Sequence, residues 1–453
     1  MKYSIEQSEI TERTEQINKF ASLVDLFNKN IVDREAFMAE LSKFEQIDWS
    51  KENLFNQLIG YCVLGDAYGA LKSRELDFRK AYYTNEFVYK EVSYYHNVQY
   101  LISRVKKEEW AALYFTAFTT SCRAYLCLAN AYDHLGRLCE AQQYYRMALW
   151  DPCNIQKVEE SQGFSYANMH AYWLEEEPFI VRKAQQIIRK YQQTFDSWSP
   201  YFSQICTWPS PSFDAPLIDY ANIQDGEYER WVCQHYLRIN RFNDVEPDST
   251  LSLYDNVKLP DIVDTPEKKA LYVSSFEEIK GSFISTRKML YTSTNENGMN
   301  IEMLKMTYKN FYSIFDKIAM FLSNYLDIRL KSYEIDFAKI WNCKNGDIRR
   351  EILEHSQNMP LLGLYNIKLD VYGMKTDWYV VDEQTKDLKM LRNYMEHKSI
   401  IIKDEPMSHT EYQLTISKQE LELNTIRLAQ LVRCAIIYLC NFVMHAEYDK
   451  LHP

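Results

Sequence analysis

The sequence contains the stretch LAQLVRCAIIYLCNFV between Leu428 and Val443, where nearly every residue is apolar. Because an α-helix turns through about 100° per residue, such a run is apolar on all sides rather than along one stripe. It forms the middle of a long predicted helix, from about Ser417 to Tyr448. A helix buried on every side belongs at the centre of a helical bundle.

The segments before this stretch also predict helices. Four are expected, at about Glu267–Tyr291, Ile301–Leu330, Asp347–Ser356 and Glu383–Ile402. The whole chain of 453 residues has only 11 Gly and 12 Pro, well below the usual shares of about 7% and 5%. A chain so poor in turn-forming residues is predicted to have an all-α fold, with a C-terminal helical bundle over residues 266–453.

The segment Ala124–Pro152 has the pattern of two packed helices joined at Gly136. Large and small apolar residues alternate in both halves, at Tyr125, Leu128, Ala129, Tyr132, Ala141, Tyr145 and Ala148. This pattern resembles a tetratricopeptide (TPR) repeat, and a weaker echo starts at Tyr61. One repeat cannot bury its own face, so we expect a degenerate TPR-like array over residues 1–195. Such arrays usually hold a protein or ligand partner.

Prolines interrupt the stretch that follows. They occur at Pro200, Pro209, Pro211, Pro216, Pro247, Pro260 and Pro266. Since proline stops a helix from continuing, residues 196–265 are predicted to be an irregular connector with one short helix at about Glu229–Ile239. Its aromatic residues indicate that it packs on its neighbours.

Acidic residues are concentrated in the N-terminal part of the chain. From Pro266 onward there are 25 Lys and Arg against 25 Asp and Glu, which leaves 27 against 38 before it, the source of the net charge of −11. Nucleic acid is therefore more plausible as a ligand of the C-terminal part. Six clustered tyrosines in the acidic part are interpreted as packing residues rather than base-stacking platforms: Tyr82, Tyr83, Tyr89, Tyr94, Tyr95 and Tyr100.

The start of the sequence and its ten cysteines bear on the compartment and on metals. The first ten residues are polar and mixed in charge, so no secretory signal is predicted. The sequence contains no run of 18 apolar residues, so no membrane span is predicted either. We expect a cytoplasmic protein with free thiols. No C-x-x-C pair occurs, so neither a metal site nor a cofactor is expected.

The stretch Leu391-Arg392-Asn393-Tyr394-Met395-Glu396-His397-Lys398 lies in the penultimate predicted helix. Its Arg392 and His397 resemble the R-x4–6-H motif of the HEPN superfamily (higher eukaryotes and prokaryotes nucleotide-binding domains). Three other pairs fit the spacing: Arg230/His235, Arg349/His355 and Arg350/His355. Only Arg392 is followed by Asn, the polar residue typical of active motifs, and flanked by long helices. Two further stretches, Asn240–Asp244 and Phe315–Ala319, resemble those of a HEPN branch whose members carry N-terminal TPR-like repeats.

The resemblance implies a homodimeric, metal-independent endoribonuclease, active as a toxin or in antiviral defence or stress growth arrest. His397 would take the proton of the RNA 2′-OH, and Arg392 would stabilise the phosphorane-like transition state. Asn393 and Glu396 would support them. Some toxin-type members carry Tyr two residues after the motif His, where this chain has Ser399, so their target chemistry does not carry over. The motifs of ATPases, dehydrogenases, serine hydrolases and zinc proteases are absent from the sequence.

Helix geometry limits what the motif can do in one chain. On a continuous helix Arg392 and His397 point about 140° apart, so either the helix ends near the motif or two copies meet in a dimer. A surface-helix interpretation also exists, in which Arg392 and Glu396 form an ordinary i,i+4 ion pair. The alternative function is then a non-catalytic TPR/HEPN scaffold or a nucleotide-binding interaction protein.

Overall fold

The computed structural model describes residues 12–74, 83, 85–103, 107–150, 154–173, 178–199, 201–210, 215–295, 300–372 and 385–452. These residues divide into two compact units. The first contains most of residues 12–158, and the second contains most of residues 159–452 together with residues 132–143. The domain limits predicted at residues 195 and 265 rest on composition, and they stay predictions.

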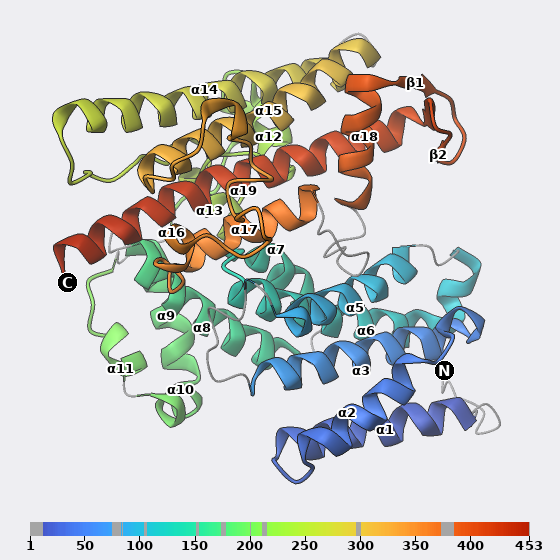
Figure 1. Cartoon of the computed structure of the whole chain (residues 1–453). Coiled ribbons are helices and arrows are strands. Elements are labelled where there is room, and N and C mark those ends of the chain that lie inside the picture. The colour runs from blue at the N-terminus through green and yellow to red at the C-terminus, as the bar shows by residue number, and fades with distance from the viewer. Residues whose placement is uncertain are drawn as a thin grey trace. The chain divides into compact units, whose positions relative to one another are not determined.

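The first unit is helical. Its helices are α1 (Glu12–Asn28), α2 (Arg34–Glu45), α3 (Leu54–Lys72) and α5 (Glu86–Ser103), while α6 (Lys107–His134) and α7 (Leu138–Ala148) contribute to both units (Figure 1). Asp33 and Asn53 cap α2 and α3 by accepting backbone N–H groups at their starts. Phenylalanines fill the core between α1 and α2, with the rings of Phe27 and Phe37 stacked at 4.0 Å.

The predicted TPR-like segment forms the helices α6 and α7. Leu128, Ala129 and Tyr132 are buried on α6, and Ala141 and Tyr145 are buried on α7. The turn between the two helices depends on a glycine, because Gly136 has a φ of +74° and a Cβ there would lie 1.9 Å from the carbonyl oxygen of Met359. Pro152 lies outside the described residues. Helices are therefore confirmed here, and the TPR assignment stays a prediction.

The clustered tyrosines are mostly buried. Tyr83, Tyr89 and Tyr95 are at most 2% exposed, and Tyr94 is half-buried, whereas Tyr100 is exposed. Tyr82 lies outside the described residues. Rings that are covered by neighbouring helices cannot stack on bases, so the burial favours packing.

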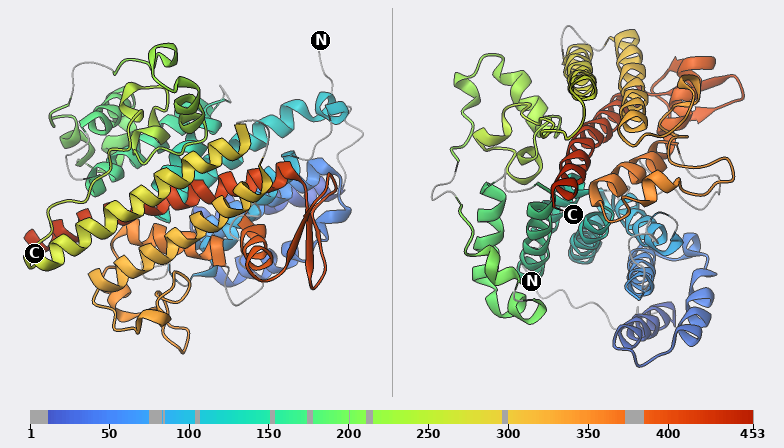
Figure 2. Two further views of the ribbon diagram at one scale, coloured as in Figure 1. Left: turned by 90° about the horizontal axis from the view of Figure 1, so that it is seen from above. Right: turned by 60° about the vertical axis from the view of Figure 1, so that its left-hand side comes forward.

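The second unit is built around the helix that contains the apolar stretch. Its longer helices are α8 (Ile155–Trp173), α9 (Pro178–Lys190), α14 (Pro266–Asn295), α15 (Ile301–Tyr325), α17 (Met359–Tyr372), α18 (Lys386–His397) and α19 (Lys418–Leu451). Figure 2 shows α14, α15 and α19 running side by side, and α17 also packs on α19. The all-α fold class is confirmed.

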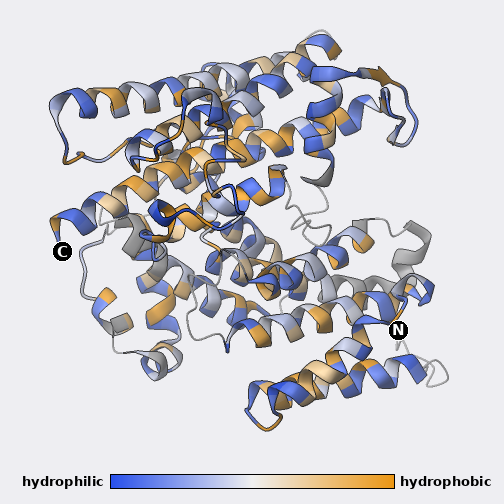
Figure 3. Ribbon diagram, viewed as in Figure 1, coloured by the Kyte–Doolittle hydropathy of each residue, from blue (hydrophilic) through white to orange (hydrophobic). Residues whose placement is uncertain are grey.

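Helix α19 is the central helix of this unit, as predicted. Between Leu428 and Val443 only Gln430 is partly accessible, and Figure 3 shows hydrophobic residues along the middle of the helix. Ser417 caps its start, and its hydroxyl accepts the backbone N–H of Glu420. The helix is long and apolar enough to cross a membrane, but 89% of its most apolar 18-residue window is buried inside the protein. It therefore behaves as a core helix.

The helix predicted for Glu383–Ile402 is wrong at its C-terminal end. Helix α18 stops at His397, Lys398 is extended, and Ser399–Ile402 form strand β1. This strand pairs in parallel with β3 (Gln413–Ile416), whose other edge pairs antiparallel with β2 (Ser408–His409). The β-branched isoleucines favour a strand. The strand is stabilised by pairing with Gln413–Ile416, which lies further along the chain.

Other predicted ends also change, and one helix was missed. Helix α15 ends at Tyr325 rather than Leu330, because Asp327 adopts a left-handed conformation with φ of +52°. The helix expected at Asp347–Ser356 is reduced to α16 (Arg350–Leu353). Helix α17 was not predicted from the sequence.

The connector contains several short elements rather than one helix. They are α10 (Gln192–Trp198), α11 (Tyr201–Ile205), α12 (Gly226–Gln234) and α13 (Phe242–Val245), with 3-10 turns at Tyr220–Asn222 and Thr250–Ser252. The predicted helix Glu229–Ile239 corresponds to α12, which ends earlier because Tyr236 has a φ of +54°. All four residues of α13 are buried, and the connector assignment itself stays a prediction.

Candidate functional site

Helix α18 is fixed in the second unit by one apolar face. Leu388 and Leu391 are completely buried, and Met395 is partly buried. The hydroxyl of Tyr308 on α15 donates a hydrogen bond of 2.6 Å to the backbone carbonyl of Leu388. This buried face leaves the motif residues on the flank and the solvent side of the helix.

Arg392 lies in an aromatic cradle that the sequence did not predict. Its guanidinium carbon is 4.6 Å from the ring centre of Tyr312 on α15 and 5.9 Å from that of Tyr372 on α17. The hydroxyl of Tyr312 donates to the carbonyl of Val371, which holds the ring in place. A cation over two ring faces is attracted to their negative surfaces. The cradle therefore restricts where the guanidinium can point.

The charges around Arg392 are mixed. Burial lowers its pKa, but Tyr372 and the carboxylate of Glu396 outweigh this effect and raise the value overall. Burial also raises the pKa of Asp316 on α15, although Arg392 acts in the opposite direction. The Tyr372 hydroxyl is buried, and among the described residues it has no hydrogen-bond partner. Asp316 belongs to a stretch that carried the family resemblance, but no role was predicted for it from the sequence.

His397 is the last residue of α18 and faces solvent. Its side chain is 71% exposed, against 29% for Arg392. The Nε2 atom of His397 is 3.7 Å from one oxygen of Glu396, and the Nε atom of Arg392 is 3.3 Å from the other. Asn393 is exposed one turn before His397. The structure thus brings Arg392 and His397 to the two oxygens of one carboxylate. The helix ends at His397, which matches the first of the two alternatives that helix geometry left open.

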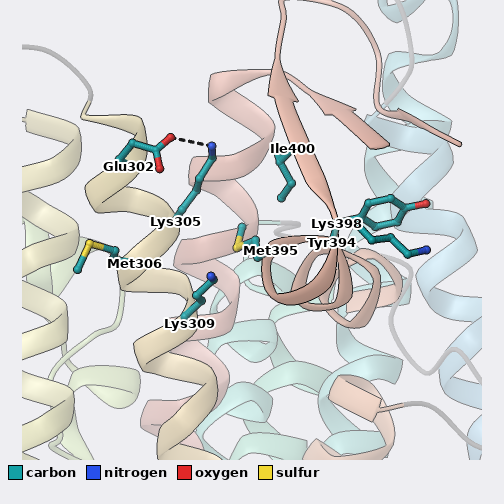
Figure 4. A pocket seen from close by; sticks show the side chains of 8 residues that line it. All are labelled: Glu302, Lys305, Met306, Lys309, Tyr394, Met395, Lys398 and Ile400. Atoms are coloured by element: carbon teal, nitrogen blue, oxygen red, sulfur yellow. Dashed lines mark hydrogen bonds and ion pairs between the residues drawn. The ribbon is translucent and has the colours of Figure 1, made fainter. Parts of the chain in front are cut away.

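A shallow pocket of about 210 Å³ lies beside the motif, between α15, the end of α18 and β1. Figure 4 shows Lys305 and Lys309 extending from α15, with Met395 and Ile400 opposite. Lys305 pairs with Glu302 at 2.8 Å, whereas Lys309 has no ion pair or hydrogen bond in the described part of the chain. The ammonium of Lys398 lies over the Tyr394 ring, to the side of the pocket. The pocket can attract an anion close to the motif.

The other Arg/His pairs with the same spacing have structural contacts. Burial lowers the pKa of His235, whose ring packs on Trp231 at 4.8 Å. Burial also lowers the pKa of His355, which packs against Phe442. Arg350 is mostly exposed and pairs with Glu354, the residue that follows its helix. Only the Arg392/His397 pair shares one carboxylate near a cationic pocket.

The second stretch behind the resemblance, Asn240–Asp244, is a buried link between the connector and α19. Arg433 on α19 forms an ion pair with Asp244 at 2.6 Å, and both side chains are fully buried. Arg433 also donates to the carbonyls of Arg238 and Asn240. Arg241 donates to the side-chain oxygen of Asn441 at 3.0 Å. These polar residues hold the connector on the core helix rather than forming a site.

Nothing in the described ranges suggests a metal centre, because no three His, Cys, Asp or Glu side chains lie close enough together to hold one.

Comparison with known protein families finds a match in the C-terminal part of the chain. The family model described as LA2681-like HEPN matches residues 263–447. No curated protein and no solved structure matches the chain. The matched region contains α14 to α18, most of α19 and the whole Arg392/His397 site, and residues 263–447 are therefore similar to HEPN domains of the LA2681-like family.

Proposed function

We propose that this HEPN-like domain is a metal-independent endoribonuclease with Arg392 and His397 as its catalytic residues. The observation that supports this most is that both side chains approach the oxygens of Glu396 at the open end of α18. A phosphate group also presents two anionic oxygens, and a guanidinium binds such a pair well. An RNA phosphate can therefore take the place of the Glu396 carboxylate between these two residues.

The reaction follows from the chemistry of these groups. Neutral His397 removes the proton from the 2′-OH of the RNA, and the 2′-oxygen attacks the adjacent phosphorus. The bond from phosphorus to the 5′-oxygen breaks, and a protonated His397 from a second copy gives that oxygen a proton. Arg392 stabilises the extra negative charge on the phosphate oxygens in the transition state. The products are a 2′,3′-cyclic phosphate and a 5′-OH, and no metal is required.

Two supporting roles complete the proposal. Glu396 holds Arg392 and His397 in place without RNA, and it must release them when a phosphate binds. Asn393, exposed one turn before His397, is positioned to hydrogen-bond the phosphate or the imidazole. Glu396→Gln keeps the shape of this residue but removes its negative charge. We expect this variant to bind RNA more tightly at low salt, because the repulsion between carboxylate and phosphate is lost.

The lysines beside the motif give the RNA backbone a path. Lys309 projects into the pocket without a partner in the described residues, and Lys305 is only partly neutralised by Glu302. Each lysine that contacts a phosphate makes binding more sensitive to salt. Lys309→Ala should therefore weaken RNA binding and reduce the slope of its salt dependence by about one. Lys344→Ala changes an exposed lysine away from the pocket and serves as the control.

The proposed active form is a homodimer. The reaction uses two histidines, and each chain supplies one motif. A two-fold axis near the end of α18 would place each motif opposite its own copy. Sedimentation at micromolar concentration should show a dimer. A chain that is fully active as a monomer would contradict the composite site, even if His397 proved essential.

The proposed role of the TPR-like array is to hold a partner that controls the nuclease. Arrays of packed helical repeats present extended concave surfaces for such partners. Release of the nuclease would arrest growth under stress or during viral attack. Truncation at residue 195 is not a safe test, because residues 132–143 are part of the second unit. The full chain is therefore the material for every assay.

The test of the nuclease proposal is an RNA cleavage assay with the full chain in EDTA. Wild type should cut mixed cellular RNA, and His397→Ala and Arg392→Ala should both lose activity. Arg350→Ala is the matched control, because Arg350 has the same spacing to a histidine and the same i,i+4 pairing with a glutamate. Cleavage that persists in His397→Ala, or that requires a metal ion, would refute the assignment.

The alternative is a non-catalytic scaffold or a nucleotide-binding interaction protein, and the ion pair between Arg392 and Glu396 supports it, because such pairs are common on helix surfaces. Overexpression separates the two functions. An active ribonuclease should slow cell growth, and Arg392→Ala should relieve that effect. Equal growth with wild type and with the variant would favour the scaffold.

A further inference from the structure

Two lysines without carboxylate partners lie on α17 and α18, both within the second unit. Lys368 belongs to α17 and Lys389 to α18, and these two helices pack on each other (Figure 1). Lys368 is partly buried, whereas Lys389 is exposed. In the described part of the chain, neither ammonium forms an ion pair or a hydrogen bond. Two like charges therefore lie near each other without a carboxylate to neutralise them.

Lys368 is an unfavourable residue for the stability of the fold. Burial, with a smaller effect from the charge of Lys389, lowers its pKa to about 8. The ammonium of Lys368 lies 5.3 Å from the ring centre of Tyr365, which offsets only part of this cost. A buried lysine normally has a carboxylate partner, as Lys280 has in Glu277 at 3.2 Å. A cation that costs stability and lacks a partner is a candidate for binding an anion.

Lys389 is also the first member of an exposed row on α18 that ends at the motif. Lys389, Asn393 and His397 are four residues apart, and all three are exposed. Because residues four apart differ by only about 40° around a helix axis, the three side chains lie on one side of α18. The row covers about 12 Å, since a helix rises about 1.5 Å per residue. A single RNA strand of a few nucleotides can follow it from His397 to Lys389.

We propose that Lys368 and Lys389 form a phosphate subsite, which binds a backbone phosphate of the RNA strand at a distance from the phosphate that is cut. The inference rests on the proposed ribonuclease function, because that function places the cut phosphate at Arg392 and His397. The strand passes Asn393 and brings a further phosphate between the two ammonium groups. Hydrogen bonds between an ammonium and a phosphate are charge-assisted and strong. The subsite makes the domain select strands that extend beyond the cut phosphate over very short ones.

The test is fluorescence anisotropy of the full chain with a labelled 2′-O-methyl RNA hexanucleotide. This probe lacks the 2′-OH that attacks in the proposed reaction, so binding is measured without cleavage. A labelled dinucleotide of the same chemistry is the matched short probe, because its one backbone phosphate cannot reach both places. The hexanucleotide should bind about tenfold more tightly, since it makes at least one more charged contact. Equal affinities for the two probes would overturn the subsite.

The variants locate the extra contact. Lys368→Met with Lys389→Ala should weaken hexanucleotide binding about tenfold and reduce the slope of its salt dependence by about one. Dinucleotide binding should stay unchanged. The matched control is Lys280→Met with Lys269→Ala, which changes a buried lysine that has a partner and an exposed lysine, both on α14.

Circular dichroism checks that both double variants are folded. The control should bind both probes like wild type. A subsite variant that keeps wild-type affinity for the hexanucleotide would overturn the proposal. Equal losses for the two probes would do the same, because they would show a general effect of positive charge rather than a separate phosphate contact.

A competition arm separates an RNA strand from a free nucleotide, which carries the same phosphate chemistry. Unlabelled ATP has three phosphates but no strand to follow α18. We expect ATP to displace the labelled hexanucleotide only at concentrations far above those of unlabelled hexanucleotide. Displacement at equal concentrations would identify a nucleotide site and overturn the assignment to an RNA strand.

Cleavage of natural RNA, measured separately, distinguishes failure of the subsite from failure of the ribonuclease. A wild type that shows the expected length dependence but leaves RNA uncut would refute the ribonuclease and keep the subsite. A Lys368→Met, Lys389→Ala variant that binds the hexanucleotide and cuts long RNA like wild type would refute the subsite and keep the ribonuclease.

Discussion

Two arginine–carboxylate pairs in the second unit have the same chemistry and opposite surroundings. Arg433 and Asp244 are fully buried between α19 and the connector, and Arg433 also donates to two backbone carbonyls. Arg392 and Glu396 are each about one-third exposed at the end of α18. A buried charge must keep its partner, whereas a half-exposed one can exchange it at little cost. The comparison explains why the first pair is structural and the second is available for a ligand.

The largest expected effect comes from breaking the buried pair. Asp244→Ala leaves Arg433 charged and unpaired in the core, which should lower the free energy of unfolding by about 3–5 kcal/mol. Glu396→Ala should lower it by less than about 1 kcal/mol, because solvent replaces the lost partner. Urea denaturation of both variants measures the difference. Similar losses for the two would mean that burial does not distinguish the pairs.

Lys368 is a partly buried cation with no carboxylate partner among the described residues, and it sharpens the comparison. Burial, with a smaller effect from Lys389, lowers the pKa of Lys368 on α17 from 10.5 to about 8. At full burial this shift corresponds to roughly 3 kcal/mol, and partial exposure reduces it to about 1–2 kcal/mol. Lys368→Met should therefore raise the free energy of unfolding at pH 7 by about that amount.

The pH dependence of this effect has a definite sign. Below pH 8 the lysine is charged in both states, so the penalty on the folded state is complete. Between pH 8 and 10.5 the folded state loses its proton before the unfolded state does, and wild type gains stability relative to Lys368→Met. The advantage of the variant should vanish by about pH 10.5. An advantage that is constant from pH 7 to 10.5 would show that it comes from packing instead.

A smaller contrast concerns two tyrosines near Arg392. Tyr308→Phe removes a hydrogen bond to the carbonyl of Leu388 and should lower the free energy of unfolding by about 1 kcal/mol. Tyr372→Phe removes a buried hydroxyl that has no partner in the described residues, so stability should stay equal or rise slightly. Thermal unfolding of the two variants tests this. A clear loss of stability in Tyr372→Phe would place an undetected partner at that hydroxyl.

The smallest expected effect on stability belongs to the motif itself. Arg392→Lys keeps the positive charge over the Tyr312 ring and should change the free energy of unfolding by less than about 0.5 kcal/mol. RNA cleavage should nevertheless fall by at least about tenfold, because an ammonium cannot hold two phosphate oxygens at once. A variant that loses activity and stability in parallel would point to a structural role for Arg392.

The core of the fold could be predicted from the sequence, because α19 is marked by a continuous apolar run and α14 and α15 by regular spacing. The end of α18 could not, since the strand Ser399–Ile402 depends on pairing with Gln413–Ile416. Helix α17 was missed because its apolar residues surround it without a clear stripe, and its Gly363 is required by close contact with the backbone of Gly136. Both failures come from contacts between distant segments.

The candidate site shows the same limit. Arg392, Asn393, Glu396 and His397 could be selected from the resemblance to the HEPN motif, although the spacing alone also fits three other Arg/His pairs. The aromatic cradle could not, because Tyr312 and Tyr372 come from two other helices and meet only when these helices pack. The pocket beside the motif, which Lys305 and Lys309 line, likewise lies between α15 and the end of α18. The residues of the motif can therefore be predicted from the sequence, whereas the side chains that surround them depend on how the helices pack.

The most direct test of the central claim is the chemistry of the RNA ends. Wild type in EDTA, incubated with a defined single-stranded RNA, should give fragments with a 2′,3′-cyclic phosphate and a 5′-OH by mass spectrometry, and His397→Ala should give none. Fragments with a 3′-OH and a 5′-phosphate, or cleavage that EDTA abolishes, would contradict the assignment of Arg392 and His397 as a metal-independent ribonuclease site.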